Sequence, residues 1–146
     1  MRRFRYHLQK IVDLKSNEKA QAEWILSNAL AKLKMEEQSL EQLHATRRSI
    51  EELLQESASV KISVAELGVL QDYLQYIDTL IKQKQESLLQ AKQDVADKSE
   101  QLVSKMKDEK IWLKARDRSF AAFKAEYLRR EQLELDEMAA VRFGKT

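Results

Sequence analysis

The chain contains no cysteine and no proline, and glycine occurs only twice in its 146 residues. Without cysteine it has neither disulfides nor thiolate metal sites, which fits a reducing compartment. Charged side chains make up 34% of the sequence. This composition is typical of proteins built from long helices, and the length suits one coiled-coil domain, residues 1–146.

The sequence also lacks a long apolar run. No segment approaches the ~20 apolar residues that a membrane span needs. The N-terminus is basic but lacks the apolar stretch of a signal peptide. We therefore expect a cytoplasmic protein with no direct membrane insertion.

A regular apolar stripe dominates the second half of the chain. Its members alternate in spacings of three and four over five heptads, which is typical of a coiled-coil seam. Because a straight helix drifts about 20° per heptad from such a stripe, the helix must wind left-handed around a partner. The stripe consists of Leu67, Leu70, Leu74, Ile77, Ile81, Lys84, Leu88, Ala91, Val95, Lys98 and Leu102.

The start of this helix is marked by three local signals. Ser63 and Glu66 have the spacing of a capping box. In this motif the serine hydroxyl accepts a hydrogen bond from the backbone amide of the glutamate, and the glutamate side chain accepts one from the backbone amide of the serine. Ile62 and Leu67 have the spacing of a hydrophobic staple. We therefore expect a turn at 57–62 and a second helix over about 63–142.

The first helix is expected over about 4–56, and its stripe is less regular. Two successive steps of three, ending at Leu43, predict a stammer that tightens the supercoil. Lys98, Leu102 and Met106 predict a complementary break in the second helix. The stripe of the first helix consists of Leu26, Leu30, Leu33, Glu37, Leu40, Leu43, Arg47, Ile50 and Leu54.

A short turn makes the two helices antiparallel neighbours. The predicted fold is therefore an all-α, two-helix antiparallel coiled-coil hairpin in which the second helix is longer. In this hairpin Phe4 lies opposite about residue 116. The second helix therefore extends beyond the first by an unpaired length of roughly 35–40 Å. Its apolar residues have no predicted partner within the chain, and such a patch usually marks an interaction site. They are Phe120, Phe123, Tyr127, Leu128, Leu133, Leu135, Met138 and Val141.

Two groups of aromatic residues admit more than one interpretation. Phe4, Tyr6 and Trp112 either fill a wider seam at the open end of the hairpin or contact a partner. Near the turn, Tyr73 and Tyr76 lie off the seam together with Leu80. They either cover the seam or form a contact patch.

Catalytic chemistry is not indicated. The two histidines, His7 and His44, are far apart, and the carboxylates alternate with lysine and arginine as on solvated helix faces. The final Gly144-Lys145-Thr146 lacks the first glycine, the strand and the helix of a phosphate-binding loop. We expect no enzymatic activity, no cofactor and no metal.

The charge distribution does not favour nucleic acid as a partner. The net charge is +2, but residues 1–20 carry +4, residues 104–130 carry +5, and residues 36–56 and 131–138 carry −4 each. Acidic residues interrupt the basic stretch 104–130, so phosphate binding would be weak and steeply salt-dependent. Basic and apolar residues do not separate into two faces, which also argues against binding to a membrane surface.

Three segments in order resemble the flagellar export protein FliJ family. The segment Phe4-Arg5-Tyr6-His7-Leu8-Gln9-Lys10-Ile11-Val12-Asp13-Leu14-Lys15 resembles the opening of the family. Residues 63–81, with their Tyr-Leu-x-Tyr-Ile-x-x-Leu-Ile core, resemble its middle. Residues 126–132 with Leu135-Asp136-Glu137-Met138 resemble its C-terminal signature, followed by Arg142-Phe143. The resemblance covers nearly the whole chain.

The resemblance implies a coiled coil similar to the rotor stalk of rotary ATPases, with three partners. These are the hexameric flagellar export ATPase, the linker region of the export-gate membrane protein, and export chaperones. The open end of the hairpin is implied to enter the ATPase ring. The ring contacts implied are Arg2, Arg3, Phe4, Leu8, Ile11, Phe120, Phe123, Tyr127, Arg130, Met138 and Phe143.

The gate contacts implied are Tyr73, Ile77, Leu80 and Lys84. Lys84 departs from the family pattern and also lies on the predicted seam. The predicted function is a non-enzymatic stalk that promotes assembly and activity of the ATPase and associates with the basal body at the inner membrane. Two alternatives remain: a helical hairpin that escorts other proteins without an ATPase role, and a basic coiled coil on nucleic acid.

Overall fold

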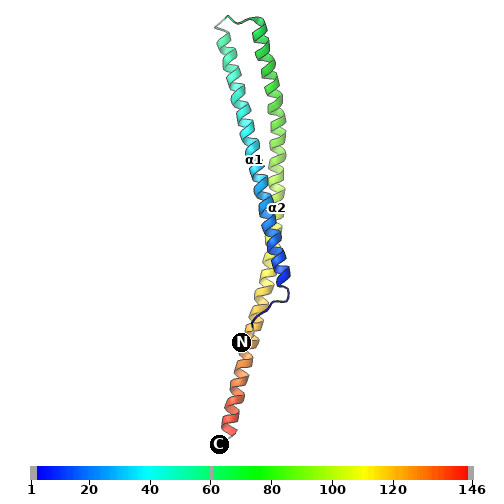
Figure 1. The fold of residues 1–146 in the computed structure, drawn as a ribbon, viewed down its shortest axis with the longest axis vertical. Coiled ribbons are helices and arrows are strands. Elements are labelled where there is room, and N and C mark those ends of the chain that lie inside the picture. The colour runs from blue at the N-terminus through cyan, green and yellow to red at the C-terminus, as the bar shows by residue number, and fades with distance from the viewer. Residues whose placement is uncertain (1–2, 60, 145–146) are drawn as a thin grey trace. The chain divides into compact units, whose positions relative to one another are not determined.

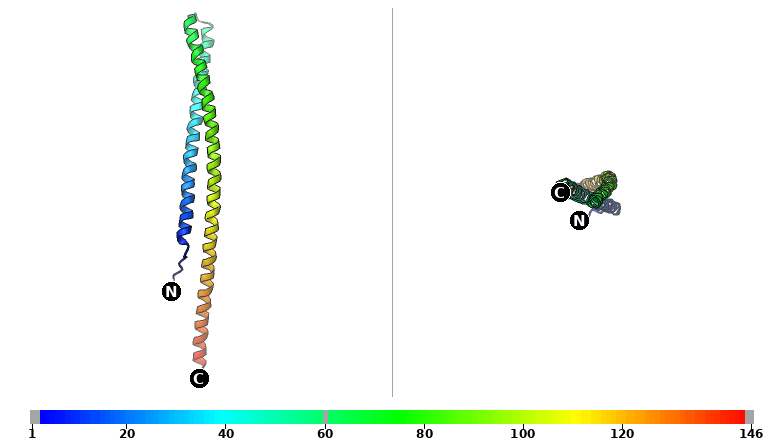
Figure 2. Two further views of the ribbon diagram at one scale, coloured as in Figure 1. Left: turned by 90° about the vertical axis from the view of Figure 1, so that its right-hand side faces the viewer. Right: turned by 90° about the horizontal axis from the view of Figure 1, so that it is seen from above.

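The computed structural model describes residues 3–59 and 61–144. Helix α1 spans Gln9–Ser57 and helix α2 spans Val64–Gly144 (Figures 1 and 2). The predicted antiparallel two-helix hairpin is confirmed, and α2 is the longer helix. The chain divides into two compact units, Met1–Gln21 with Val103–Thr146, and Ala22–Leu102. We call them the open-end unit and the closed-end unit and describe each by itself.

The closed-end unit contains the turn, and the start of α2 follows the predicted cap. The Glu66 amide donates to Ser63 Oγ at 3.2 Å, and the Leu67 amide donates to the Ser63 carbonyl at 3.1 Å. The first bond satisfies one of the amides that a helix N-terminus leaves unpaired, and the second is the first backbone hydrogen bond of the helix itself. At the end of α1, Ser57 Oγ donates to the Leu54 carbonyl at 2.6 Å. The predicted turn at 57–62 includes Val60, which lies outside the described residues.

The seam of α2 in this unit is the one that the sequence predicts. None of its eleven members from Leu67 to Leu102 is exposed. Ile77 and Ile81 are buried and form the core cluster with Ile50 of α1. The half-buried leucines packed against this cluster are Leu40, Leu43, Leu54, Leu74 and Leu80.

The predicted stammer in α1 is wrong. Leu30 is 47% exposed whereas Ala29 is 7% exposed, and Glu36 rather than Glu37 turns inward. With Ala29 and Glu36 in the seam, the spacing alternates between four and three without a break from Ala22 to Leu54. A short alanine packs between close helices, and an inward glutamate is tolerated because Lys84 Nζ lies 3.1 Å from its Oε2.

The open-end unit has a largely ionic seam. Lys15 Nζ lies 2.9 Å from Asp108 Oδ2, and Lys105 Nζ lies 3.3 Å from Glu18 Oε2. Val12 is the only buried apolar residue among those described in this unit. The second predicted break is also wrong, because Met106 is exposed and Lys105 takes its inward position.

Residues 3–8 of the open-end unit are not helical. The predicted start of the first helix at about residue 4 is corrected to Gln9. A turn precedes α1, in which the Gln9 amide donates to the Tyr6 carbonyl at 3.1 Å. Because this segment is not helical, the chain can place Phe4 against α2. There its ring contacts the rings of Phe120 and Phe123.

Candidate interaction surfaces

An aromatic groove lies in the open-end unit. The Phe4 ring centroid is 5.1 Å from that of Phe120 in an edge-on arrangement and 5.4 Å from that of Phe123. The Phe123 and Tyr127 rings stack at 6.5 Å. Such pairs contribute about 0.5–1.5 kcal/mol each beyond the area they bury. The expectation that Phe120 and Phe123 lack a partner within the chain is therefore wrong, because Phe4 covers them.

The groove beside this cluster has apolar walls and a basic rim. Its volume is about 680 Å³. Arg3 and Lys124 supply the rim, while the walls are aromatic and aliphatic. Such a site accepts an apolar side chain flanked by acidic groups. Its lining residues are Arg3, Phe4, Phe120, Phe123, Lys124, Tyr127 and Leu128.

Beyond the groove, every described residue of α2 from Leu128 to Gly144 is exposed. Ion pairs along the helix include Arg129 to Glu126 at 2.8 Å and Arg130 to Glu126 at 3.5 Å. A hydrogen bond from Arg129 is the main reason that the pKa of Glu126 is lowered. The pKa of Tyr127 is raised, chiefly through its hydrogen bond to Glu131. The large apolar side chains exposed here are Leu128, Leu133, Leu135, Met138, Val141 and Phe143.

The implied ring contacts fall into three places. Five of them line the aromatic groove: Arg3, Phe4, Phe120, Phe123 and Tyr127. Arg130, Met138 and Phe143 are exposed further along α2, and Leu8 and Ile11 are half-buried near the start of α1. Arg2 lies outside the described residues.

The implied gate contacts do not share one surface. Tyr73 is 45% exposed, and its ring stacks with that of Tyr76 at 6.3 Å. Ile77 is only 3% exposed, in the core cluster. Lys84 is half-buried and paired with Glu36. Tyr73, Leu80 and Lys84 are therefore at least partly accessible, whereas Ile77 is not. The exposure of both tyrosines favours a contact patch over a cover for the seam.

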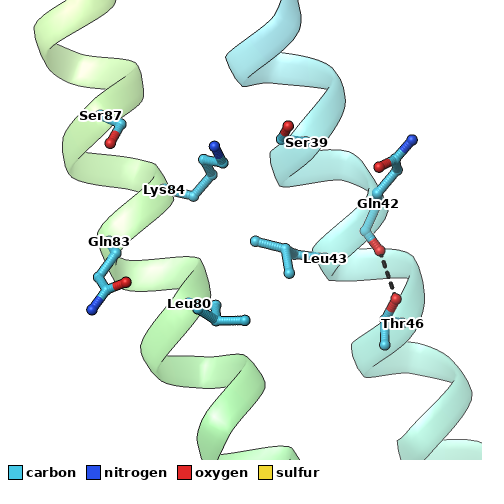
Figure 3. A pocket seen from close by; sticks show the side chains of 8 residues that line it. All are labelled: Ser39, Gln42, Leu43, Thr46, Leu80, Gln83, Lys84 and Ser87. Carbon is cyan, nitrogen blue, oxygen red and sulfur yellow. Dashed lines mark hydrogen bonds between the residues drawn. The ribbon is translucent and has the colours of Figure 1, made fainter.

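Sequence reasoning missed a second groove, which lies in the closed-end unit. Figure 3 shows Leu43 of α1 pointing toward Leu80 and Lys84 of α2. The volume of this groove is about 500 Å³. Its lining residues are Ser39, Gln42, Leu43, Thr46, Leu80, Gln83, Lys84 and Ser87. The signal that could have revealed it is the uncharged residue before each seam position from Glu36 to Leu54 on α1 and from Leu74 to Ala91 on α2.

Within residues 3–59 and 61–144, acidic and histidine side chains do not cluster as a metal site requires. In the same part of the chain, neither helix has a segment long and apolar enough to cross a membrane.

The fold defines a class of protein: a coiled-coil hairpin of two helices of unequal length. The chain belongs to the FliJ family, since the family model described as "Flagellar FliJ protein" matches residues 4–146. Among solved structures, a YscO homologue, CT670 from Chlamydia trachomatis, is similar at a TM-score of 0.67 and 16% identity. The match covers 95% of this chain and 94% of that one, and it supports the fold. Among curated proteins, none matches.

Family membership gives the chain a general role. It is a type III export-related stalk protein, associated with the flagellar export machinery.

Proposed function

We propose that this chain docks its open end in the ring of the hexameric flagellar export ATPase and promotes assembly and activity of that ring. The chain also links the ATPase to the export-gate membrane protein and to export chaperones, at the basal body on the cytoplasmic side of the inner membrane. It carries out no chemistry itself. The observation that supports this proposal most directly is the aromatic groove with its basic rim, continued by the exposed apolar end of α2.

The groove suits a reversible contact. Phe4 already fills part of the aromatic surface, so a partner adds to a preformed site instead of ordering a free helix. Preformed sites lose less side-chain entropy on binding. Beyond residue 128, the exposed surface of α2 contains both apolar and charged residues. This mixture limits the affinity for the ATPase ring and allows the stalk to be released from it.

The test measures ATP hydrolysis by the cognate export ATPase at low ATPase concentration, with and without this protein. The double variant Phe120→Ala with Tyr127→Ala removes two walls of the groove. Tyr76→Ala is the matched control, because Tyr76 is an exposed tyrosine of the closed-end unit. We expect stimulation by the unchanged chain and by Tyr76→Ala, and loss of stimulation with the double variant. Equal stimulation by all three proteins would contradict docking through the groove.

A second candidate function is escort of partner proteins without an ATPase role. The stacked and exposed Tyr73 and Tyr76 favour it. A chaperone complex that survives removal of residues 120–146 and is lost in Tyr73→Ala would support this function. A complex that is lost on removal of residues 120–146 and survives Tyr73→Ala would exclude it.

A further inference from the structure

The end of α2 beyond the aromatic groove carries an uncharged stripe. Nine of the 19 residues from 124 to 142 are charged. Five residues in this stretch, at alternating spacings of three and four, are nevertheless all uncharged and exposed. Such spacing places them along one side of the helix, as in a coiled-coil seam. The stripe consists of Ala125, Leu128, Gln132, Leu135 and Ala139.

This stripe does not continue the side of α2 that packs within the hairpin. Phe123 and Tyr127 are the last half-buried residues of α2. Continuing from them in steps of three and four reaches Arg130, Glu134 and Glu137, which are all charged. The uncharged stripe therefore lies on a different side of the helix, and packing within the chain does not account for it.

The same end of α2 is divided by the sign of its charge. Residues 116–130 contain five basic and two acidic side chains, whereas residues 131–138 contain four acidic and no basic ones. Arg129 and Arg130 pair with Glu126 on their own helix, yet their side chains remain 64% and 60% exposed. A second copy running in the opposite direction would set each basic half against an acidic half. A copy running in the same direction would set like charges together, which is unfavourable.

We propose that this stripe pairs with the same stripe of a second copy of the chain, in an antiparallel helix pair. The occupant is a second copy because the segment is complementary to itself, in apolar spacing and in charge. The inference goes beyond the proposed ring contact and concerns the chain alone. The pairing covers Leu128, which also lines the aromatic groove, so a paired copy withholds one wall of the groove from any other partner.

One register satisfies both the stripe and the charges. When the pair is centred midway between residues 133 and 134, Leu128 packs against Ala139 of the second copy. In the same register Arg129 lies beside Asp136 of the second copy. Twofold symmetry makes each contact occur twice. The small alanine lets the two helices approach closely, and the charged pair flanks the stripe as in other coiled coils.

The first test asks whether the full-length chain associates with itself. Sedimentation equilibrium at low salt should show a monomer–dimer equilibrium in the micromolar range. Association should weaken at high salt, because salt screens exposed charges. A chain that stays monomeric at about 500 μM would overturn the proposal. Since the ATPase is absent, this result is independent of the ring contact, and a failure of the ring contact in the ATPase assay leaves the pairing standing.

Charge reversal tests the complementarity. The acidic variant carries Arg129→Glu with Arg130→Glu, and the basic variant carries Asp136→Arg with Glu137→Arg. For each variant alone we expect the dissociation constant of self-association to rise about tenfold or more. An equal mixture should associate about as tightly as the unchanged chain, because the reversed halves again meet opposite charges. Normal self-association of the acidic variant, or a mixture that does not associate, would overturn the proposal.

Matched changes elsewhere provide the controls. Lys82→Glu with Lys92→Glu alters the charge as the acidic variant does, at exposed residues of the closed-end unit, and should change the dissociation constant less than about twofold. Leu135→Ala removes a leucine of the stripe, and we expect a rise of about tenfold. Leu133→Ala removes an exposed leucine from another side of the same helix and should have little effect. Equal effects of the two leucine changes would contradict the stripe.

Spin labels report the direction of pairing. Because the chain has no cysteine, a single introduced cysteine carries the only label. In the proposed register, labels on Gln132→Cys lie close to the twofold axis. Labels on Ala122→Cys are about 35 Å apart along the pair, from the 1.5 Å rise per residue of a helix. A short distance at position 122 would indicate a parallel pair and overturn the proposal. Helical circular dichroism of each variant checks that the hairpin is intact.

Discussion

Replacing Ile77 by alanine tests whether this residue acts in the core or at a partner surface. Ile77 is 3% exposed and packs with Ile50 and Ile81 in the cluster that holds the closed-end unit together. Isoleucine-to-alanine changes in cores cost about 2–5 kcal/mol. A seam between two helices lets the surroundings close over the gap more easily than a thick core does. We therefore expect a loss in the lower half of that range, about 2–3 kcal/mol.

The assay is urea unfolding at 25 °C, followed by helical circular dichroism. Leu89→Ala is the control, since Leu89 is 70% exposed, and we expect it to change the free energy of unfolding by less than about 0.5 kcal/mol. Tyr73→Ala should also leave stability nearly unchanged. If Ile77→Ala cost less than about 1 kcal/mol while abolishing gate binding, the assignment of Ile77 to the core would be refuted.

Three further changes test other parts of the structure. Ser63→Ala removes the acceptor for the Glu66 amide, and we expect urea unfolding to show a loss of about 1 kcal/mol. The pKa of Glu109 is lowered, first by a hydrogen bond from Ser16 and then by one from Lys19. Its contribution to stability is therefore present above the ordinary glutamate pKa and is lost as the pH falls through the lowered value, so Glu109→Gln should flatten the acid limb of a stability–pH profile. Phe4→Ala uncovers the aromatic rings of α2, and we expect faster amide hydrogen exchange in the first turn of α1, measured by mass spectrometry.

Sequence patterns predicted the hairpin because its main determinants are local or strictly periodic. The Ser63 cap depends on residues three and four positions away. The α2 seam repeats over five heptads, so a single polar member such as Lys84 does not obscure it. Both features are properties of one segment, and neither needs knowledge of the opposite helix.

The inward residues of α1 could not be chosen in the same way. Leu30 is more apolar than Ala29, so hydrophobicity favours the exposed Leu30 over the buried Ala29. Glu36 and Glu37 are chemically identical, so hydrophobicity does not distinguish them. The position of Lys84 Nζ on the facing helix decides in favour of Glu36. The candidate site residues show the same limit, because the exposure of Ile77 and Tyr73 differs and depends on the facing helix.

The two units differ in how they hold their helices together, and the difference matches their proposed roles. Among the described residues, five of the six buried apolar ones lie in the closed-end unit: Ala29, Ile50, Ile77, Ile81 and Ala91. The open-end unit relies instead on partly exposed ion pairs, each of which typically contributes no more than about 1 kcal/mol. In the same unit, Phe4 contacts the rings of Phe120 and Phe123 on α2, so aromatic contacts add to these ion pairs. The distribution of buried residues therefore favours a rigid gate-facing surface and a more adaptable ring-facing one.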